Sequence, residues 1–235
     1  MEHAEVLLLA LFVALYLFDS ALLLHSNEAL LLQGRGSRWL VGFGSSKILL
    51  RGLELYLPNP LLPTRPCYRL SWQQGAKGTR KPASKVVRQP QPLALIVLIW
   101  NHFWLSFVVL PLALFVQWGD AIVVLAFALI YANVVLLVLA LGWHRRALGL
   151  TGKELASIAF EISICPPFAL NLIRRLSLRR RIDEDFVVAA KRLQTPSDWE
   201  LTKAQLLSRL STELECEEPD APRAKALRAQ FEQLS

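Results

Sequence analysis

Four polar side chains lie within segments that are otherwise almost entirely apolar: Asp19, Asn101, His102 and Asn133. In a membrane-spanning helix an ionisable group costs about 2.5–3.5 kcal/mol on insertion scales, and such groups commonly mark an ion path or a ligand site. An Asp19–His102 pair could carry a proton, hold a lipid headgroup or bind a ligand. The alternative is that these side chains join helices to one another through hydrogen bonds.

The depth of these side chains bears on whether they can meet. At 1.5 Å per residue, Asp19 lies about 10 Å and His102 about 15 Å from the cytoplasmic end of its predicted helix. Asn133 lies near the middle of its own segment. Asp19, Asn101 and His102 could therefore approach one another in the cytoplasmic half of a helical bundle.

Two long apolar segments joined at Gly119-Asp120 predict a membrane-spanning hairpin. Leu93–Trp118 and Ala121–Trp143 contain no Lys, Arg, Asp or Glu, and about 20 apolar residues in a helix cross the roughly 30 Å of hydrocarbon. Trp118 and Trp143 lie at opposite ends of the hairpin, where indole rings favour the membrane interface.

A third span is predicted at the N-terminus, over Val6–Leu24. The alternative is a cleaved signal peptide, which requires a basic start and small residues before the cleavage site. Here the first residues include Glu2 and Glu5, and no clear Ala-x-Ala follows. We therefore expect an uncleaved signal anchor.

The distribution of Lys and Arg predicts the orientation of these segments. The N-terminal residues and the Gly119-Asp120 turn carry none, whereas the loop before the hairpin and the segment after it are basic. Basic loops remain in the cytoplasm. We expect an integral protein of the cell (inner) membrane, with its N-terminus outside and its C-terminus in the cytoplasm.

A fourth apolar segment, Glu154–Leu172, contains Glu161 and a Pro166-Pro167 break, so we expect a bend near Cys165. A full span would export the arginines that follow it, whereas an interfacial or re-entrant helix keeps both flanks on one side. The flanking arginines are candidates for binding anionic lipid headgroups: Arg145, Arg146, Arg174, Arg175, Arg179, Arg180 and Arg181.

The loop before the hairpin contains short patterns typical of strands. Ser37–Phe43 and Lys47–Leu57 flank a Gly-Ser-Ser turn, and alternation of apolar and polar residues around Glu54 indicates one buried face. Cys67–Trp72 could be a further strand, and these segments together predict a small β-meander. Residues 73–91 are expected to be an exposed basic tether.

The C-terminal tail has helical periodicity. Asp183–Leu193 predicts one helix, and the Thr195-Pro196-Ser197-Asp198 start signal predicts a second that ends near Cys216. Ala221–Leu234 could form a last helix. These helices are short, so we expect them to pack on one another, on the preceding loop or on a partner.

The predicted fold class is an all-α integral membrane protein. It has three transmembrane helices, an interfacial or re-entrant helix, a small possible β-meander in the cytoplasmic loop and a helical cytoplasmic tail. The expected regions are the signal anchor at 1–25, the basic loop at 26–91, the hairpin at 92–143 with its outer turn at 119–120, the basic-flanked helix at 144–181 and the tail at 182–235.

No catalytic constellation is evident in the sequence. The histidines and cysteines are dispersed, so we expect no metal site and no cofactor. The net charge of +7 is concentrated beside the apolar segments, which favours anionic lipid over nucleic acid.

Three functions stay open. The first is a non-enzymatic accessory, assembly or scaffold subunit that engages another membrane or cytoplasmic protein. The second is a small oligomeric transporter or channel subunit that uses Asp19, His102 and Asn133. The third is a lipid-headgroup enzyme that uses His25, His144 or Glu161.

Overall fold

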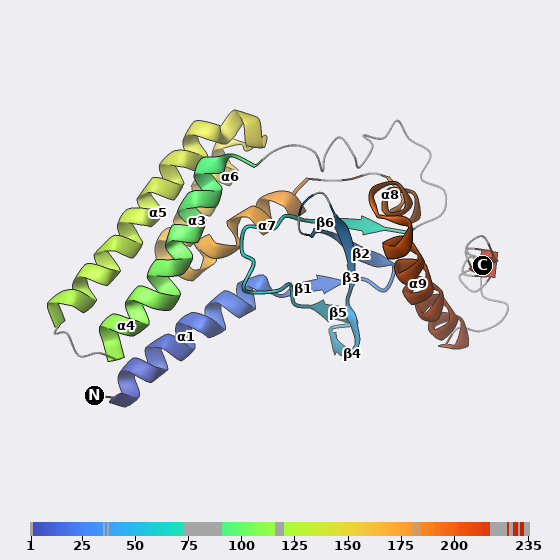
Figure 1. Cartoon of the computed structure of the whole chain (residues 1–235), viewed down its shortest axis with the longest axis horizontal. Coiled ribbons are helices and arrows are strands. Elements are labelled where there is room, and N and C mark those ends of the chain that lie inside the picture. The colour runs from blue at the N-terminus through green and yellow to red at the C-terminus, as the bar shows by residue number, and fades with distance from the viewer. Residues whose placement is uncertain are drawn as a thin grey trace.

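A computed structural model shows how the apolar and basic segments are arranged (Figure 1). It describes residues 2–34, 36, 38–72, 91–115, 120–180, 182, 184–216, 225, 228–229 and 231–232. The predicted tether at 73–91, the predicted last helix and Arg181 lie wholly or largely outside the described residues, as does most of the turn between the hairpin helices.

Two helical stretches are long and apolar enough to cross a membrane. The first comprises α3 (Leu93–Trp104), the π-helical turn η1 (Leu105–Val109) and α4 (Leu110–Phe115), and the second is α5 (Asp120–Leu148). They contain 23 and 29 residues with mean hydropathies of 2.1 and 2.9. Their lengths of about 35 and 44 Å exceed the hydrocarbon thickness. These two stretches support association with a membrane.

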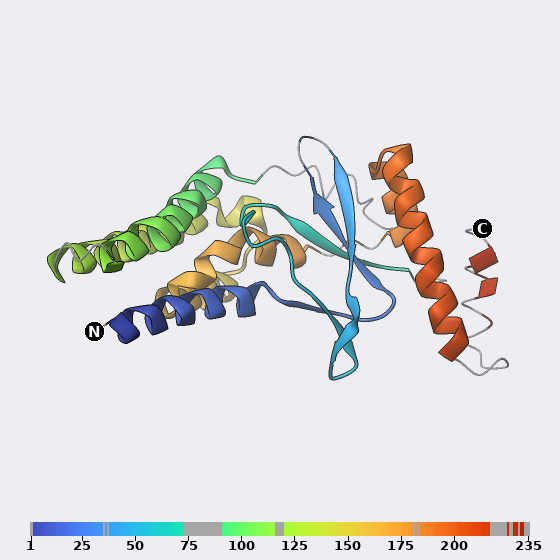
Figure 2. The same ribbon diagram turned by 60° about the horizontal axis from the view of Figure 1, so that its bottom comes forward.

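The prediction of a third span is wrong, because only two helices in the described part of the chain meet the length and hydropathy required. Helix α1 (Glu2–Ser20) is apolar only between Glu5 and Asp19. That apolar part is about 20 Å long, which is less than the hydrocarbon thickness. α1 lies beside the hairpin (Figures 1 and 2), and the Phe12 ring meets the Phe107 ring at 6.0 Å.

The π-helical turn has a local cause in the sequence. Pro111 has no N–H to donate to the carbonyl four residues earlier. Just before it, the backbone N–H of Leu110 donates to the Leu105 carbonyl, which is the wider π-type hydrogen bond. The long apolar stretch therefore continues through the proline without ending.

The segment after the hairpin folds back on itself. It consists of α6 (Gly152–Ile164), the 3₁₀ helix η2 (Pro166–Asn171) and α7 (Leu172–Leu178). The break after Ile164 confirms the predicted bend near Cys165. Arg179, just after α7, pairs with Glu154 at the start of α6 at 3.5 Å. The beginning and the end of the segment therefore lie beside each other.

The apolar core of the helical part joins this fold-back to the hairpin. Ile158 and Ile162 of α6 and Leu172 of α7 pack with Leu137 and Leu141 of α5, and all five are fully buried. α6 begins with a capping box, in which Thr151 and Glu154 satisfy each other's backbone N–H groups. The fold-back is therefore part of the helical bundle.

The all-α fold class is wrong, because the chain between α1 and α3 forms two antiparallel three-stranded sheets. Their strands are β1 (Leu22–Leu24), β2 (Glu28–Gln33), β3 (Trp39–Phe43), β4 (Ser45–Leu50), β5 (Leu53–Tyr56) and β6 (Cys67–Ser71). The strand orders are β1-β5-β4 and β3-β2-β6. The predicted meander is therefore wrong as well, because β2 pairs with both β3 and β6.

β2 escaped prediction because it is buried on both faces. Leu30 and Leu31 are adjacent and each is 0 % exposed, so the strand shows no alternation of apolar and polar residues. Leu31 lies opposite Val41 on one neighbour and Tyr68 on the other. A central strand of this kind gives a short apolar run that periodicity cannot distinguish from a buried helix.

The glycines around β3 and β4 allow the two sheets to approach closely. A Cβ on Gly42 would lie 2.6 Å from the Tyr56 hydroxyl, and one on Gly44 would lie 2.4 Å from Glu54 Cβ.

Arg51 and Gly52 both have positive φ, 54° and 78°, in the two-residue turn between β4 and β5.

Helices α8 (Phe186–Leu193) and α9 (Pro196–Cys216) cover the β3-β2-β6 sheet. They lie on the far side of the sheets from the hairpin (Figures 1 and 2). Phe186 and Leu206 are buried against this sheet. Both helices confirm the tail predictions, and Thr195 Oγ1 accepts from the Asp198 N–H at the expected start of α9.

Candidate functional site

Asn101, His102 and Asn133 form one hydrogen-bonded network between α3 and α5, in which His102 and Asn133 are buried and Asn101 is exposed. Asn101 Nδ2 donates to Asn133 Oδ1 at 2.9 Å, and Asn133 Nδ2 contacts His102 Nδ1 at 3.2 Å. Asn133 Nδ2 also donates to the Leu98 carbonyl at 3.1 Å. Since the amide donates to Nδ1, the proton of a neutral His102 ring resides on Nε2. His102 and Asn133 are therefore satisfied within the protein.

His102 Nε2 contacts the carbonyl oxygen of Pro166 at 2.9 Å. The Pro166-Pro167 pair interrupts the backbone ladder of the fold-back, and non-helical backbone at membrane depth is tolerated only where protein or water satisfies it. His102 is 0 % exposed and supplies that partner. The contact places the apex of the fold-back about 15 Å along α3 from Leu93.

A second buried network, which we call the Asn171 joint, connects α1 with η2 and α7. Asn171 Nδ2 donates to the Tyr16 carbonyl at 3.2 Å and to Asp19 Oδ2 at 3.0 Å. Asn171 Oδ1 accepts from Arg174 Nη1 at 2.8 Å and from Ser20 Oγ at 3.0 Å. Every hydrogen-bonding atom of the Asn171 amide therefore has a partner.

Arg174 extends the Asn171 joint to the loop between β5 and β6. Its Nη2 donates to the carbonyls of Asn59, at 2.5 Å, and Leu62, at 3.1 Å. Arg174 is 4 % exposed. A buried guanidinium is costly unless its N–H groups are bonded, and these carbonyls supply the bonds.

Asp19 and His102 do not bond to each other as a pair, because each side chain bonds to other residues. Asp19 binds Asn171, whereas His102 binds Pro166 and Asn133. The two residues therefore meet opposite ends of the same short helix, η2, rather than each other.

The arginines predicted to bind headgroups occupy different environments. Arg145 and Arg146 are exposed at the end of α5. Arg175 pairs with Glu161, and Arg179 pairs with Glu154. Arg174 lies inside the Asn171 joint, and Arg180 lines a pocket.

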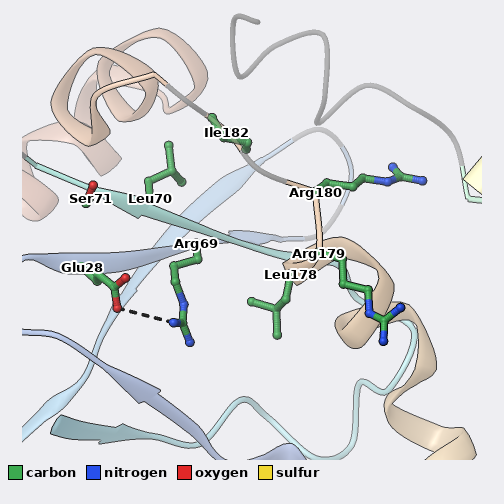
Figure 3. Close-up of a pocket in the computed structure, with 8 residues that line it drawn as sticks. All are labelled: Glu28, Arg69, Leu70, Ser71, Leu178, Arg179, Arg180 and Ile182. Atoms are coloured by element: carbon green, nitrogen blue, oxygen red, sulfur yellow. Dashed lines mark ion pairs between the residues drawn. The ribbon is translucent and has the colours of Figure 1, made fainter. Parts of the chain in front are cut away.

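This pocket has a volume of about 600 Å³ and lies where the β2–β6 edge meets the end of α7 (Figure 3). Its polar lining residues are Glu28, Arg69, Ser71, Arg179 and Arg180, and three apolar side chains complete it. Three guanidinium groups against one carboxylate make it electropositive. Arg69 extends toward Glu28 on one wall, and Arg179 and Arg180 lie on the other (Figure 3).

Tyr68, Arg180 and Gln91 form a group of neighbouring polar side chains with buried polar atoms. Burial raises the pKa of the Tyr68 hydroxyl, and the charge of Arg180 and hydrogen bonding with Arg180 and Gln91 oppose that rise. The hydroxyl therefore keeps its proton near neutral pH and can donate.

Of the residues considered for headgroup chemistry, Glu161 is held by neighbouring side chains. Glu161 accepts from Ser157 Oγ at 2.9 Å and pairs with Arg175. Cys67 is 1 % exposed, and burial raises its pKa to about 11, which leaves the thiol unreactive. Among the described residues, no group of three or more His, Cys, Asp or Glu side chains could hold a metal ion.

Sequence reasoning missed the roles of Asn171, Arg69 and Tyr68. An amide just after a Pro-Pro break in an apolar segment requires partners, and that signal could have drawn attention to Asn171. The contribution of Arg69 had no local signal, because the opposite wall of the pocket comes from residues far away in the chain.

No protein-family model, curated protein or solved structure shows significant similarity to this chain.

Proposed function

We propose that this chain is a non-enzymatic membrane scaffold, an accessory or assembly subunit that holds a partner protein at the cytoplasmic face. The hairpin of α3 to α5 anchors it. The fold-back of α6 to α7 and the Asn171 joint brace the two sheets against this anchor. The outer surface of α8 and α9 then presents a platform for the partner.

The observation that carries this proposal is that the buried polar groups of the hairpin bond to the protein itself. His102 and Asn133 contact each other, and they also bond to the Pro166 and Leu98 carbonyls. Asp19 of α1 likewise bonds to Asn171. Side chains that line an ion path face a cavity or water. Their bonding within the protein favours helix-joining roles over transport.

The proposed orientation follows from the two spans and the distribution of charge. With two spans, both ends of the chain lie on one side of the membrane, so the predicted outer N-terminus is replaced by a cytoplasmic one. The exposed Arg145 and Arg146 at the end of α5 support a cytoplasmic location for that end in a cell membrane.

The arm formed by β4 and β5 supports a position of the sheets at the surface of the membrane. Ile48, Leu49 and Leu50 are 54 %, 61 % and 54 % exposed, and Lys47 and Arg51 flank them. The arm projects freely from the sheets in Figure 2 and belongs to the sheet whose strand β1 directly follows α1. Apolar tips with basic flanks suit the interface of an anionic bilayer.

A photo-crosslinking experiment tests the scaffold role. A photoreactive amino acid replaces Leu201, which is 67 % exposed on α9, in the full chain in native membranes. We expect one protein to be crosslinked and to co-purify after mild detergent extraction. The variants Leu201→Glu and Val188→Glu should reduce that co-purification. A label at Val135, an exposed apolar position on α5, is the matched control.

Point variants are preferable to deletion of residues 183–235, because α8 and α9 cover the core of the β3-β2-β6 sheet. A monodisperse monomer without an adduct at Leu201 or Val188 would contradict the scaffold role. Ion or solute flux in proteoliposomes that Asp19→Asn or His102→Ala abolishes, with insertion intact, would instead establish transport.

A further inference from the structure

We propose that two copies of this chain associate within the membrane through the exposed side of α3 that carries Asn101. This surface belongs to the hairpin, whereas the proposed partner protein binds α8 and α9, so either proposal can fail without the other. The inference rests on the unpaired part of the Asn101 amide, on the spacing of the exposed residues around it and on the position of Trp104.

Asn101 is an exposed amide within an apolar helix. It lies about 12 Å along α3 from Leu93. The hydrocarbon core is roughly 30 Å thick, so this depth is inside the core rather than at its interface. No water is present there to bond a polar side chain, and such side chains bond across neighbouring helices instead.

Only part of the Asn101 amide is bonded within the chain. Its Nδ2 donates one hydrogen bond to Asn133 Oδ1 at 2.9 Å. A side-chain amide carries two N–H donors and an acceptor oxygen. The described residues supply no other partner to this side chain. One donor and the acceptor oxygen therefore remain for a neighbour in the membrane.

A free donor beside a free acceptor is complementary to a second copy of itself. All copies insert into the membrane in the same orientation, so a two-fold axis between two copies is parallel to the membrane normal. Equivalent residues then meet at the same depth. The Asn101 amides of the two copies can each donate to the oxygen of the other, which a lipid tail cannot replace.

The exposed residues on this side of α3 have the spacing of a helix-packing surface. They recur at alternating intervals of three and four residues and form what we call the Asn101 stripe: Ala94, Val97, Asn101, Trp104 and Val108. All five are exposed, so no described segment covers the stripe. This spacing lets helices pack knobs into holes, and a single Asn within such a stripe fixes the register and the number of helices.

Trp104 is a second indication of a protein contact. It is 57 % exposed and lies about 17 Å along α3 from Leu93, near the centre of the hydrocarbon core. Indole rings favour the membrane interface, where the N–H group reaches water. An exposed Trp at mid-depth therefore suits contact with a neighbouring helix better than contact with lipid tails.

Oxidative crosslinking in native membranes tests the contact. The full chain carries Val97→Cys, in a background where Cys165 and Cys216 are Ser and the remaining Cys67 is buried. Two thiols on either side of a two-fold axis form a disulfide only where the helices touch. With iodine, which enters membranes, as the oxidant, we expect a dimer of the chain that a reductant separates.

Val135→Cys on α5 is the matched control. Val97 and Val135 are each 57 % exposed. Val135 lies close in sequence to Asn133, the hydrogen-bond partner of Asn101, so the two positions have similar depths. We expect at least tenfold less crosslinked dimer from Val135→Cys than from Val97→Cys.

Energy transfer between donor- and acceptor-labelled copies in liposomes measures the affinity of the dimer. Asn101→Val removes the amide and should weaken dimerisation about tenfold. Val97→Phe keeps the amide and its bond to Asn133 but adds bulk to the Asn101 stripe, so it should weaken dimerisation as well. Val135→Phe, the same change away from the stripe, should alter the affinity less than twofold. Circular dichroism verifies that each variant is folded.

Three results would overturn the proposal. The first is energy transfer no greater than random proximity of the labels produces. The second is equal crosslinking at Val97 and Val135, because the disulfides would then reflect chance collisions. The third is crosslinking of Val97→Cys to a different protein alone, which would assign the Asn101 stripe to another partner.

Discussion

At the residue scale, the same side-chain chemistry serves different ends according to burial. His102 and Asn171 are 0 % and 1 % exposed; His102 satisfies the Pro166 carbonyl at the start of η2, and Asn171 satisfies the Tyr16 carbonyl of α1. Arg174 donates to Asn171 Oδ1 and to the Asn59 and Leu62 carbonyls inside the protein, whereas Arg180 lines the pocket. Neighbouring arginines in one basic cluster therefore divide between joining elements and lining a pocket.

Replacement of Asn133 by Leu should destabilise the hairpin. The change conserves side-chain size but leaves Asn101 Nδ2 and His102 Nδ1 without a partner. We expect a loss of about 1–3 kcal/mol, from the cost of unsatisfied buried groups, measured by unfolding in mixed detergent micelles. Tyr131→Phe is the control on the same helix, because Tyr131 is 47 % exposed. Equal stability of Asn133→Leu and Tyr131→Phe would contradict the prediction.

Asp198 should give the β3–α9 contact a defined pH dependence. Hydrogen bonds from Arg38 and Thr195 lower the pKa of Asp198 from 3.8 to about 2. Because the folded protein favours the ionised carboxylate, this stabilisation is complete above about pH 4 and is lost as the pH falls through about 2.

Chemical unfolding followed by tryptophan fluorescence checks this dependence, since Trp39 and Trp199 pack in the core that the sheet shares with α8 and α9. Between pH 5 and pH 2.5, wild type should lose more stability than Asp198→Asn. Parallel pH profiles for the two proteins would show that this carboxylate does not contribute.

At the element scale, chain segments that look alike in sequence take up distinct positions. The segment of α6 and α7 follows α5 in an apolar part of the sequence, yet the Pro166-Pro167 break folds it back within the bundle. β4 is an edge strand with exposed apolar residues, whereas β2 is a central strand buried on both faces. Position within a sheet or bundle therefore decides what an apolar segment contacts.

The exposed β4–β5 arm should insert into an anionic bilayer surface. A fluorescent NBD label is attached to the variant Leu49→Cys, in a background where Cys165 and Cys216 are Ser and the remaining Cys67 is buried. In proteoliposomes with phosphatidylglycerol we expect blue-shifted emission and protection from aqueous iodide. The same label at Leu201 of α9 should stay accessible. Equal quenching at the two positions would place the arm in water.

At the scale of the whole molecule, polar contacts hold the β-rich unit between two groups of helices. The Asn171 joint ties α1 and the β5–β6 loop to α7. At the opposite side of the sheets, Arg209 of α9 donates to Glu54 at 2.7 Å and lies 4.8 Å from the Phe43 ring centre. The sheets are therefore held from both sides, as Figure 1 shows.

If the hairpin contributes the two membrane crossings that we propose, both ends of the chain lie on the same side of the membrane. Epitope tags added before Met1 and after Ser235 should both resist protease in intact cells and both be digested after permeabilisation. The turn between the hairpin helices should be the accessible part, tested with a tag inserted after Gly119. Digestion of the N-terminal tag alone in intact cells would refute this arrangement.

Much of the local structure could be predicted, because local residue patterns determine it. The long apolar segments, the Pro-Pro break after Cys165 and the start of α9 at Thr195 each depend on neighbouring residues. The β segments near Phe43 and Leu55 were visible from their turn residues and alternation. The third span failed because apolar character was extended past Asp19 to Leu24, although that part forms the sheet strand β1.

The sequence by itself determined that this protein has a membrane-compatible hairpin with strongly basic flanks, since hydropathy and charge are sums over adjacent residues. Only the tertiary structure decided that β2 joins β3 and β6, that His102 meets Pro166 rather than Asp19, and that Arg69 lines the same pocket as Arg180. Those contacts depend on which distant surfaces are complementary in shape and hydrogen bonding, and no local pattern encodes that choice.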